Sequence, residues 1–432
     1  MAMTDAPRPA GLWRHGDFLK LWGGETVSQV GAQITLLALP LTAIITLRAT
    51  PEQLGLLTAA QYAPVLLITL FAGVWLDTHR KRPALLAANL GRAVLLGLVP
   101  LLYALDALTM PALYGIAFLS GLLTAFFDVA YVVYLPSLVS RDQLVEANSR
   151  LEATYSIASI GGPGLGGLLI QWLTAPVSIV VNAVSYLVAA ASVAVIRHRE
   201  PPPAAPERRG STWAEIREGL AATVRDPRLR SLAAGAAWFN LFEQYVLTLY
   251  LLYGVRDLGL TTSLLGTILA VGSVGALAGT LVANRAGRSL GVGRTLVWSM
   301  LLSCAALGLV PAADGPQLVA GTILAAGLFL YGLGLAVFNV HSLSLRGAIV
   351  SERLLGRVTA TYRFLVFGTI PLGGLLGGLL GGLLGVRAAL VIAVAALVAG
   401  GVAFAFTRIR AVGNEVFQAR PRAGEEEPCS VD

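Results

Sequence analysis

The sequence predicts an all-α membrane protein with twelve transmembrane helices in two pseudo-symmetric six-helix bundles. Three observations support this fold class. Hydrophobic residues make up 56% of the 432 positions and charged residues only 13%, with a mean hydropathy of +0.73, whereas a soluble domain carries about 25% charged residues. The chain divides into twelve long apolar stretches. A polar motif of the first half also recurs in the second half.

The twelve apolar stretches are predicted to be helices that cross the membrane. Roughly 20 apolar residues span a hydrocarbon layer about 30 Å thick, and a lone strand there would leave its backbone groups without hydrogen bonds. In the first half the predicted spans are Phe18–Leu47, Leu54–Leu76, Ala84–Leu105, Pro111–Leu138, Leu151–Leu173 and Val177–Ile196. In the second half they are Ser231–Tyr253, Thr262–Asn284, Thr295–Pro311, Gln317–Leu345, Val358–Leu384 and Ala388–Thr407.

The polar segments divide the chain and indicate its orientation. They predict a cytoplasmic N-terminal segment (1–17), a first bundle (18–196), a cytoplasmic linker (197–230), a second bundle (231–407) and a disordered cytoplasmic tail (408–432). Basic residues crowd into one set of connections, and the opposite set holds only Arg48, Arg256 and Arg387. Positive charge marks the cytoplasmic side, so we expect both termini there. This scattered pattern, with a net charge of +7, does not indicate a nucleic-acid binder.

One segment of the linker has helical spacing. Between Thr212 and Arg225, four apolar residues recur near the helical period with arginines opposite them, namely Trp213, Ile216, Leu220 and Val224. The pattern predicts an amphipathic helix. It either lies on the inner leaflet or serves as a plain linker helix, and the sequence favours neither.

Two separate repeats indicate that the chain was built by duplication. The segment Gly73–Arg82 joins the second and third spans and recurs 206 residues later as Gly279–Arg288. The stretch Arg150–Leu169 matches the stretch Arg357–Leu376 at an offset of 207. Two independent matches at nearly one offset predict homologous halves in parallel orientation, related by an axis along the membrane normal.

These motifs resemble those of the major facilitator superfamily. The resemblance covers about Phe18 to Thr407 and implies the major facilitator fold. Residues Leu135–Asn148 and Arg346–Val358 are similar to the branch of macrolide-efflux proteins and enterobactin exporters. The residues that resemble the superfamily's cytoplasmic gate motif are Gly73, Asp77, Arg80, Lys81 and Arg82. Those that resemble its exporter signature in the fifth helix are Gly162, Pro163, Gly166 and Gly167.

The resemblance implies that Asp77 is part of a latch. An acid at this helix end can accept hydrogen bonds from the start of the eleventh helix, and this contact would hold the cytoplasmic side closed. The alternative is a topology signal of arginines with an incidental acid. The chain departs from the family pattern at Arg80, where glycine is usual, at Ala283, where an acid would be the second latch, and at Ala32, where many relatives have Asp.

The glycines of the fifth and eleventh spans predict close helix packing. Gly162, Gly164 and Gly167 formally match a dinucleotide-binding fingerprint, but that motif needs a preceding strand. Small residues inside an apolar helix instead allow neighbouring helices to approach closely. A glycine ridge that repeats every four residues runs from Gly373 to Gly385. It either meets a helix of the other half and lets the halves rock, or is static packing.

Acidic residues inside apolar spans are the candidate proton carriers. A charge at mid-bilayer costs about 2.5–3.5 kcal/mol, and a desolvated carboxyl group can bind and release protons near neutral pH. Glu243 lies 12 residues after Ser231, about 18 Å along the helix and close to the midplane. We expect Glu243 first, and Glu25 second, to carry the proton. Asp128 is a third candidate or pairs with a cation near the gate, such as Arg82 or Arg92.

Polar residues share helix faces with these acids and predict a substrate cavity. The superfamily architecture implies that the first, fourth, seventh and tenth helices line this cavity. The candidate lining residues are Gln29, Gln33, Tyr131, Asn240, Gln244 and Asn339. Arg92 and Arg363 are expected near the inner ends of their spans, where they snorkel or pair.

Together these features predict a secondary active exporter in a bacterial inner membrane. It would exchange an amphipathic, drug-like or macrolide-like compound for protons by alternating access, with the proton gradient as energy source and without a cofactor or metal. The alternatives are a dedicated exporter of a siderophore or another endogenous metabolite, and a non-transporting membrane receptor. We expect no enzyme, because four scattered histidines form no catalytic constellation, and no ATP-driven pump, because a phosphate-binding loop is absent. The sequence does not indicate an oligomeric state.

Overall fold

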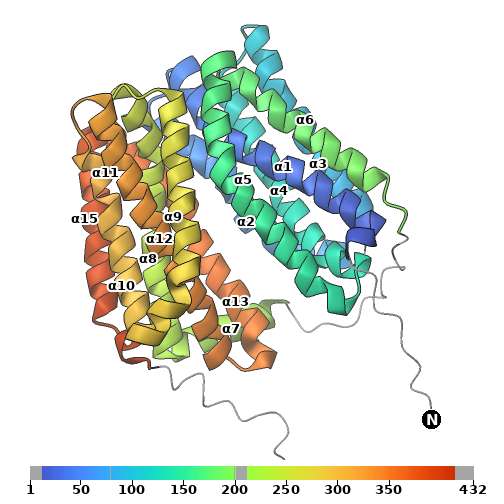
Figure 1. Cartoon of the computed structure of the whole chain (residues 1–432), viewed down its shortest axis with the longest axis vertical. Coiled ribbons are helices and arrows are strands. Elements are labelled where there is room, and N and C mark those ends of the chain that lie inside the picture. Colours follow the sequence, from blue (N-terminus) through green and yellow to red (C-terminus); the bar gives the residue numbers. More distant parts are fainter. Residues whose placement is uncertain (1–11, 78, 199, 201–211, 414–432) are drawn as a thin grey trace, which may run out of the picture.

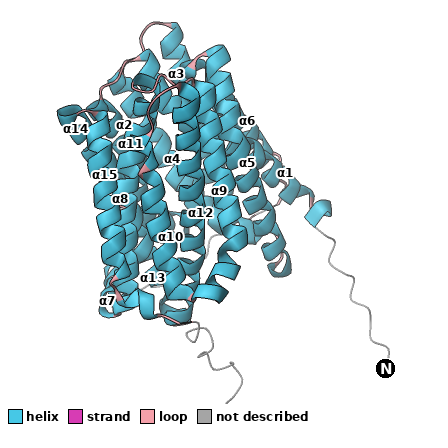
Figure 2. Cartoon of the chain, turned by 60° about the vertical axis from the view of Figure 1, so that its left-hand side comes forward, coloured by secondary structure: helices cyan, strands magenta, loops and turns pink. Residues whose placement is uncertain are grey.

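Long helices make up nearly all of the described structure, and no strand occurs in it (Figure 2). The computed structural model describes residues 12–77, 79–198, 200 and 212–413. The side chains of Arg14, residues 67–78, Arg141, residues 212–216 and Glu352 lie outside the described part. Residues 1–11, most of the linker and the acidic end of the tail lie outside it entirely, so the predictions made for them are not addressed by the structure.

Six long helices form the N-terminal half and follow the first six predicted spans in order. They are α1 (Gly16–Leu41, extended by the π-helical turn Thr42–Thr46), α2 (Pro51–Asp77), α3 (Lys81–Ala104), α4 (Met110–Leu138), α5 (Leu144–Leu173) and α6 (Ala175–Ala194). Helix α5 begins earlier than the predicted span. A capping box of Ser140 and Gln143 starts the 3-10 turn Arg141–Gln143, which leads directly into α5. The first repeat motif lies across the break between α2 and α3, with Gly73–Asp77 in α2 and with Lys81 and Arg82 in α3.

Eight helices form the C-terminal half. They are α8 (Pro227–Arg256), α9 (Thr262–Leu290), α10 (Val292–Leu307), α11 (Leu309–Ala312), α12 (Gln317–Ile349), α13 (Glu352–Phe367), α14 (Ile370–Leu384) and α15 (Val386–Ala405). The second repeat motif does not form a loop: α9 continues to Leu290, and the chain turns at Gly291, whose φ of +81° suits glycine.

Two predicted spans are each interrupted just before a proline, whereas α1, α2, α3, α4 and α5 continue through an internal proline. Helix α10 ends at Leu307 and α13 ends at Phe367, each four residues before a proline, Pro311 and Pro371. A proline cannot donate a hydrogen bond to the carbonyl four residues earlier, and its ring crowds that carbonyl. The ninth and eleventh predicted spans therefore consist of two helical pieces each.

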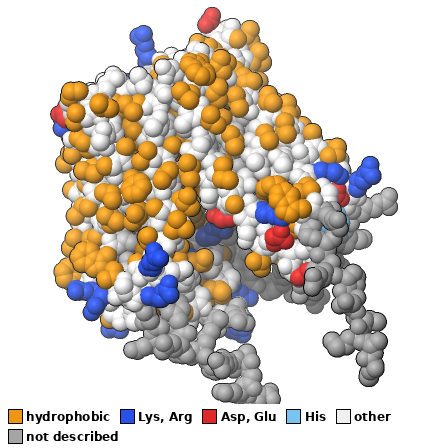
Figure 3. Space-filling view, viewed as in Figure 1, with side chains coloured by type: hydrophobic (Ala, Val, Ile, Leu, Met, Phe, Trp, Pro, Cys, Tyr) orange, Lys and Arg blue, Asp and Glu red, His pale blue; other side chains and the backbone are white. Residues whose placement is uncertain are grey.

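Nine helical segments of the described chain, counting joined pieces as one, are long and apolar enough to cross a membrane. Helices α2, α5 and α8 are as long but are not among the nine. On the face shown in Figure 3, hydrophobic side chains cover the flanks of both halves. Exposed side chains such as Ile157, Leu281 and Leu383 are expected on a lipid-facing surface.

The predicted linker helix is present as α7 (Thr212–Arg225) and packs on α13. Glu218 forms ion pairs with Arg357 and, at 3.3 Å, with Arg353. A methyl group at Gly219 would lie 2.7 Å from the carbonyl oxygen of Arg357, so the two helices are in close contact. Leu220 on α7 remains exposed, which leaves contact with a leaflet as a prediction.

Candidate functional site between the two halves

One seam between the halves is formed by α2 and α14. A methyl group at Gly378 would lie 2.7 Å from the carbonyl oxygen of Pro51 and 2.9 Å from Cα of Gly55. The backbones therefore approach as closely as glycine allows. The neighbouring Gly377 faces Tyr245 of α8 instead. The prediction that the glycine ridge meets a helix of the other half is confirmed, and the same ridge also packs within its own half.

The second seam is formed by α5 and α9, which contain the exporter signature and the start of the eighth predicted span. A methyl group at Gly167 would lie 3.1 Å from Cα of Ser263 and 3.2 Å from Cα of Gly266. Thr262 donates a hydrogen bond to the carbonyl oxygen of Gly167 at 3.2 Å. Gly162 and Gly166 face α1 rather than α9. The glycines of the signature therefore pack α5 against one helix of its own half and one helix of the other half.

The halves meet at one end of the molecule and diverge at the other (Figure 1). The joined end holds the start of α2, where the carbonyl of Ala49 accepts a hydrogen bond from Arg256 at 2.8 Å. Helices α7 and α13 lie at the diverging end, and the surface is hollowed between the halves there (Figure 3). The hollow is the candidate functional site.

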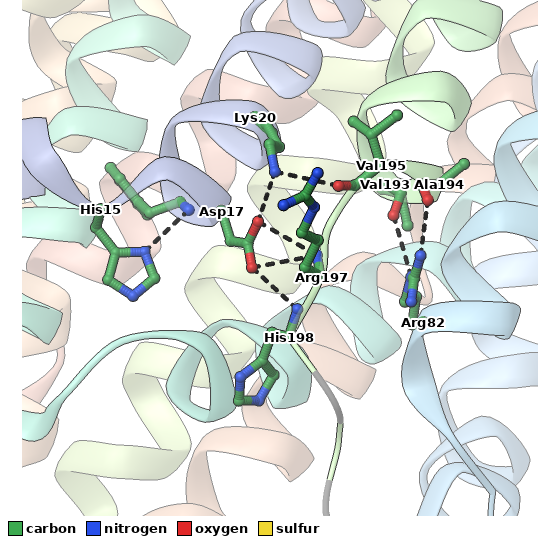
Figure 4. A network of polar contacts seen from close by, with 10 residues as sticks. His15, Asp17, Lys20, Arg82, Val193, Ala194, Val195, Arg197 and His198 are labelled. Atoms are coloured by element: carbon green, nitrogen blue, oxygen red, sulfur yellow. Dashed lines mark hydrogen bonds and ion pairs between the residues drawn. The ribbon is translucent and has the colours of Figure 1, made fainter.

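The gate motif lies at the diverging end, but its described residues contact only the N-terminal half. The Arg82 guanidinium donates to the carbonyl oxygens of Val193 at 3.2 Å and Ala194 at 2.7 Å, which caps the end of α6 (Figure 4). The backbone N–H groups of Lys81 and Arg82 donate to the two carboxylate oxygens of Glu200 at 2.7 and 2.5 Å. Arg80 is exposed. The surroundings of Gly73 and of the Asp77 carboxylate lie outside the described part of the chain, so the latch remains a prediction.

Two acids of the N-terminal half surround one buried arginine. Gln29 donates to Glu25 at 2.6 Å. Arg92 interacts electrostatically with both Glu25 and Asp128, which also repel each other. Of the two expectations for Arg92, snorkelling to a helix end is wrong, because this residue is only 3% exposed. It pairs instead: its guanidinium donates to Asn89 at 2.5 Å and lies 4.2 Å from the ring centres of both Phe127 and Tyr186. The two aromatic faces stabilise this buried cation.

Asp128 has a second electrostatic partner across the hollow. Arg363 of α13 acts on it from the other half, and both side chains are exposed. Arg82, which the sequence offered as a partner, is occupied by the end of α6. Asp128 is therefore a carboxylate between two cations, with neither of which it forms a close ion pair within the described chain.

Glu243 in the C-terminal half has a different environment. It lies near the middle of α8 and is half-buried. The hydroxyl of Tyr331 on α12 donates a hydrogen bond to its carboxylate, and the ring of Tyr331 is stacked on Phe239 with centres 6.5 Å apart. No cation of the described chain lies within ion-pair distance of it. Because no cation of the described chain is close enough to balance it, the negative charge of this carboxylate can be removed only by a proton.

Five of the six polar cavity candidates have their own contacts in the described chain, and the place of all six on a common cavity surface stays a prediction. Asn240 and Gln244 make hydrogen bonds within α8, at 3.0 Å to the Ala236 carbonyl and 3.4 Å to the Thr248 hydroxyl. Gln33 packs against Gly162 of α5. The three others are Gln29 beside Glu25, Tyr131 stacked on Phe127, and the exposed Asn339.

A cavity of about 190 Å³ lies inside the N-terminal half, between α1, α2, α3, α4 and α6. Neither this cavity nor the two tyrosines that interact with Glu243 were predicted from the sequence. Tyr62 lines the cavity and also interacts electrostatically with Glu243 of the other half. Tyr331 is 88 residues from Glu243 along the chain. The sequence shows each tyrosine only as a hydroxyl group within an apolar span. Helical periodicity relates residues on one helix, so it cannot predict a contact with an acid on another helix.

Comparison with solved structures identifies the fold. The nucleoside transporter NupG matches with a TM-score of 0.73 at 12% identity, over 94% of this chain and 100% of that one. A bacterial homologue of the iron transporter ferroportin matches at 18% identity in both of its states. Its inward-facing state gives a TM-score of 0.74 over 91% of this chain and 98% of that one, and its outward-facing state gives 0.58 over 90% and 98%.

Sequence relatives agree with this fold. The multidrug efflux pump Tap of Mycolicibacterium fortuitum is 27% identical over 380 residues, which cover 84% of this chain and 88% of Tap. The MFS-type transporter y4rN of Sinorhizobium fredii is 24% identical over 81% of this chain and 84% of its own length. A family model described as "Transmembrane secretion effector" matches residues 9–429. The chain therefore belongs to the transmembrane secretion effector family, a family of major facilitator superfamily transporters and not of enzymes.

Proposed function

We propose that this transporter exports amphipathic small organic compounds from a bacterial cytoplasm in exchange for protons. The membrane would be the inner membrane, with both termini in the cytoplasm and the diverging end of the halves open to it. The name of Tap, a multidrug efflux pump, supports export of drug-like compounds. The basic residues of the connections at this end support the orientation.

The observation that carries the proposal is the state of Glu243. Its carboxylate lies at mid-helix and is held by the Tyr331 hydroxyl, without a cation of the described chain to balance its charge. An unbalanced charge at mid-bilayer costs about 2.5–3.5 kcal/mol, which a proton would remove. Glu243 is thus suited to gain a proton from one side of the membrane and lose it to the other.

The two seams supply a route for alternating access. Close glycine contacts join α2 to α14 and α5 to α9 at one end only. Opening these seams while the other end closes would expose the hollow to the opposite side. Asp77 would stabilise the closed cytoplasmic end as the latch.

A transport assay tests the proposal. Purified protein is reconstituted in liposomes, a pH gradient is imposed, and uptake of fluorescent amphipathic drugs is followed together with proton flux. We expect gradient-driven transport by the native chain and none by Glu243→Gln, which keeps the size and hydrogen bonding of the side chain but cannot ionise.

The control is an acid outside the membrane spans. Asp106 is exposed between α3 and α4 and has a φ of +52°, which asparagine tolerates, so Asp106→Asn should transport like the native chain. Equal gradient-driven transport by Glu243→Gln would remove Glu243 from the mechanism. If transport by the native chain did not depend on the pH gradient, the proposed proton coupling would be wrong.

A further inference from the structure

We propose that the cavity inside the N-terminal half is a binding subsite for an uncharged aromatic ring that carries a hydrogen-bonding group. The inference rests on the proposed export function, because the ring would be one part of the exported compound. The cavity belongs to one half only, and the other half holds the candidate proton carrier Glu243.

The size of the cavity suits one ring system. Its volume is about 190 Å³, and an apolar protein cavity of about 150 Å³ is known to bind benzene. Leu36, Leu39, Val65 and Leu96 supply apolar walls. The cavity can therefore accept a substituted or fused ring, but not a whole macrolide-sized molecule.

The lining favours uncharged groups. None of its fourteen residues is acidic or basic. A cation or anion placed there would meet no opposite charge in the lining. Arg92 lies 4.2 Å from the ring centre of one lining residue, Tyr186, and adds a further penalty for a cation.

Three polar groups of the lining have unused hydrogen-bonding capacity. Gln61, Ser120 and Thr124 are part of this lining, and their side chains make no hydrogen bond within the described chain. In contrast, Asn182 is fixed by a 2.7 Å bond to Thr35. A small number of polar groups in an otherwise apolar pocket is typical of a ligand site, where they orient the ligand. A hydroxyl or carbonyl on the ring would pair with them.

One residue of the cavity lining is linked electrostatically to the candidate proton site. Tyr62 is part of the lining and interacts electrostatically with Glu243 of the other half. An occupant of the cavity would therefore meet a residue that is in the electrostatic field of Glu243. Compound and proton would be held by different halves.

A binding measurement without any gradient tests the proposal. Purified full-length protein in detergent is titrated with two probes of one shape, neutral 2-naphthylmethanol and cationic (2-naphthylmethyl)trimethylammonium, and bound probe is measured by equilibrium dialysis against protein-free micelles. We expect saturable binding of the alcohol only.

Ser120→Phe, which fills the cavity, should weaken binding of the alcohol at least tenfold. The matched control is Leu119→Phe, the neighbouring residue on α4 with an exposed side chain, which should bind like the native chain.

A second variant covers the case in which Ser120→Phe does not fold. Thr124→Val removes one hydroxyl at nearly constant volume, and we expect about threefold weaker binding of the alcohol. Equal binding by all variants, equal binding of both probes, or displacement of the alcohol only by added lipid would overturn the proposal. Because no gradient is applied, a negative binding result would not contradict proton exchange. Likewise, a negative result in the transport assay would not contradict binding at this site.

Discussion

In the N-terminal half, Glu25 and Asp128 share the electrostatic field of Arg92, whereas in the C-terminal half Glu243 has a tyrosine hydroxyl and no cation of the described chain beside it. A nearby cation stabilises the charged form of an acid, and its absence in an apolar environment favours the neutral form. Acids within apolar helices therefore need not have equal roles. The acids around Arg92 suit a permanent charge balance, and Glu243 suits a charge that changes during the cycle.

The largest expected effect separates Glu243 from Glu25. Replacing Glu243 by Gln should abolish gradient-driven transport, whereas Glu25→Gln should leave transport dependent on the gradient at a lower rate. The assay is transport into liposomes at several imposed pH differences. If transport by Glu25→Gln did not depend on the gradient while transport by Glu243→Gln still did, Glu25 and not Glu243 would be the proton carrier.

The next effect concerns Arg92. Arg92→Met keeps most of the packing against Phe127 and Tyr186 but removes a buried cation that lies on both rings and acts electrostatically on Glu25 and Asp128. We therefore expect a loss of about 2 kcal/mol or more in stability. Thermal unfolding in detergent measures it. Adding Glu25→Gln to Arg92→Met should recover part of the loss, because one uncompensated acid is removed. A double variant no better than the single one would mean that Arg92 acts by packing alone.

A smaller effect is expected for Tyr331. Its hydroxyl donates to Glu243, and a hydrogen bond to a charged group contributes about 1.5–3 kcal/mol. Tyr331→Phe should therefore slow gradient-driven transport by roughly tenfold or more. Tyr114→Phe on α4 is the matched control, since Tyr114 lies away from the acids. Equal rates in both variants would show that the hydrogen bond to Glu243 has no part in transport.

The smallest effect is expected for Asp128. It is exposed and forms no close ion pair within the described chain, and such charges contribute at most about 1 kcal/mol. Asp128→Asn should change transport by less than about fivefold, measured as initial rates in the same liposomes. A loss as large as that of Glu243→Gln would move the proton site into the N-terminal half and end the contrast between the halves.

Local patterns were enough to predict most of the fold. Apolar length gave the spans, and the duplicated motifs gave the two halves, because both signals depend on neighbouring residues or on a constant offset. The interruptions before Pro311 and Pro371 were missed because apolar length does not register a missing backbone donor. The extension of α9 through Arg288 was missed because charged residues at a membrane surface can continue a helix as easily as end it.

The candidate site was predictable only in part. Glu243, Glu25 and Asp128 are visible in the sequence because an acid within an apolar span is rare. Their surroundings depend on contacts between helices, which no local pattern contains. Arg92 appeared to be near a helix end by position, but two aromatic rings from α4 and α6 enclose it. Likewise, the cavity is formed by five helices and has no signature on any one of them.

The capping of α3 by Glu200 limits the distance by which the two halves could separate in the proposed cycle. Glu200 is tied to the N-terminal half through the N–H groups of Lys81 and Arg82, and α7 is tied to the C-terminal half through Glu218. Only the twelve steps from Glu200 to Thr212 connect the two anchors, and a chain of that length reaches about 40 Å when fully extended. The linker is thus a tether of fixed maximum length, and shortening it should restrict the widest opening before it affects either half.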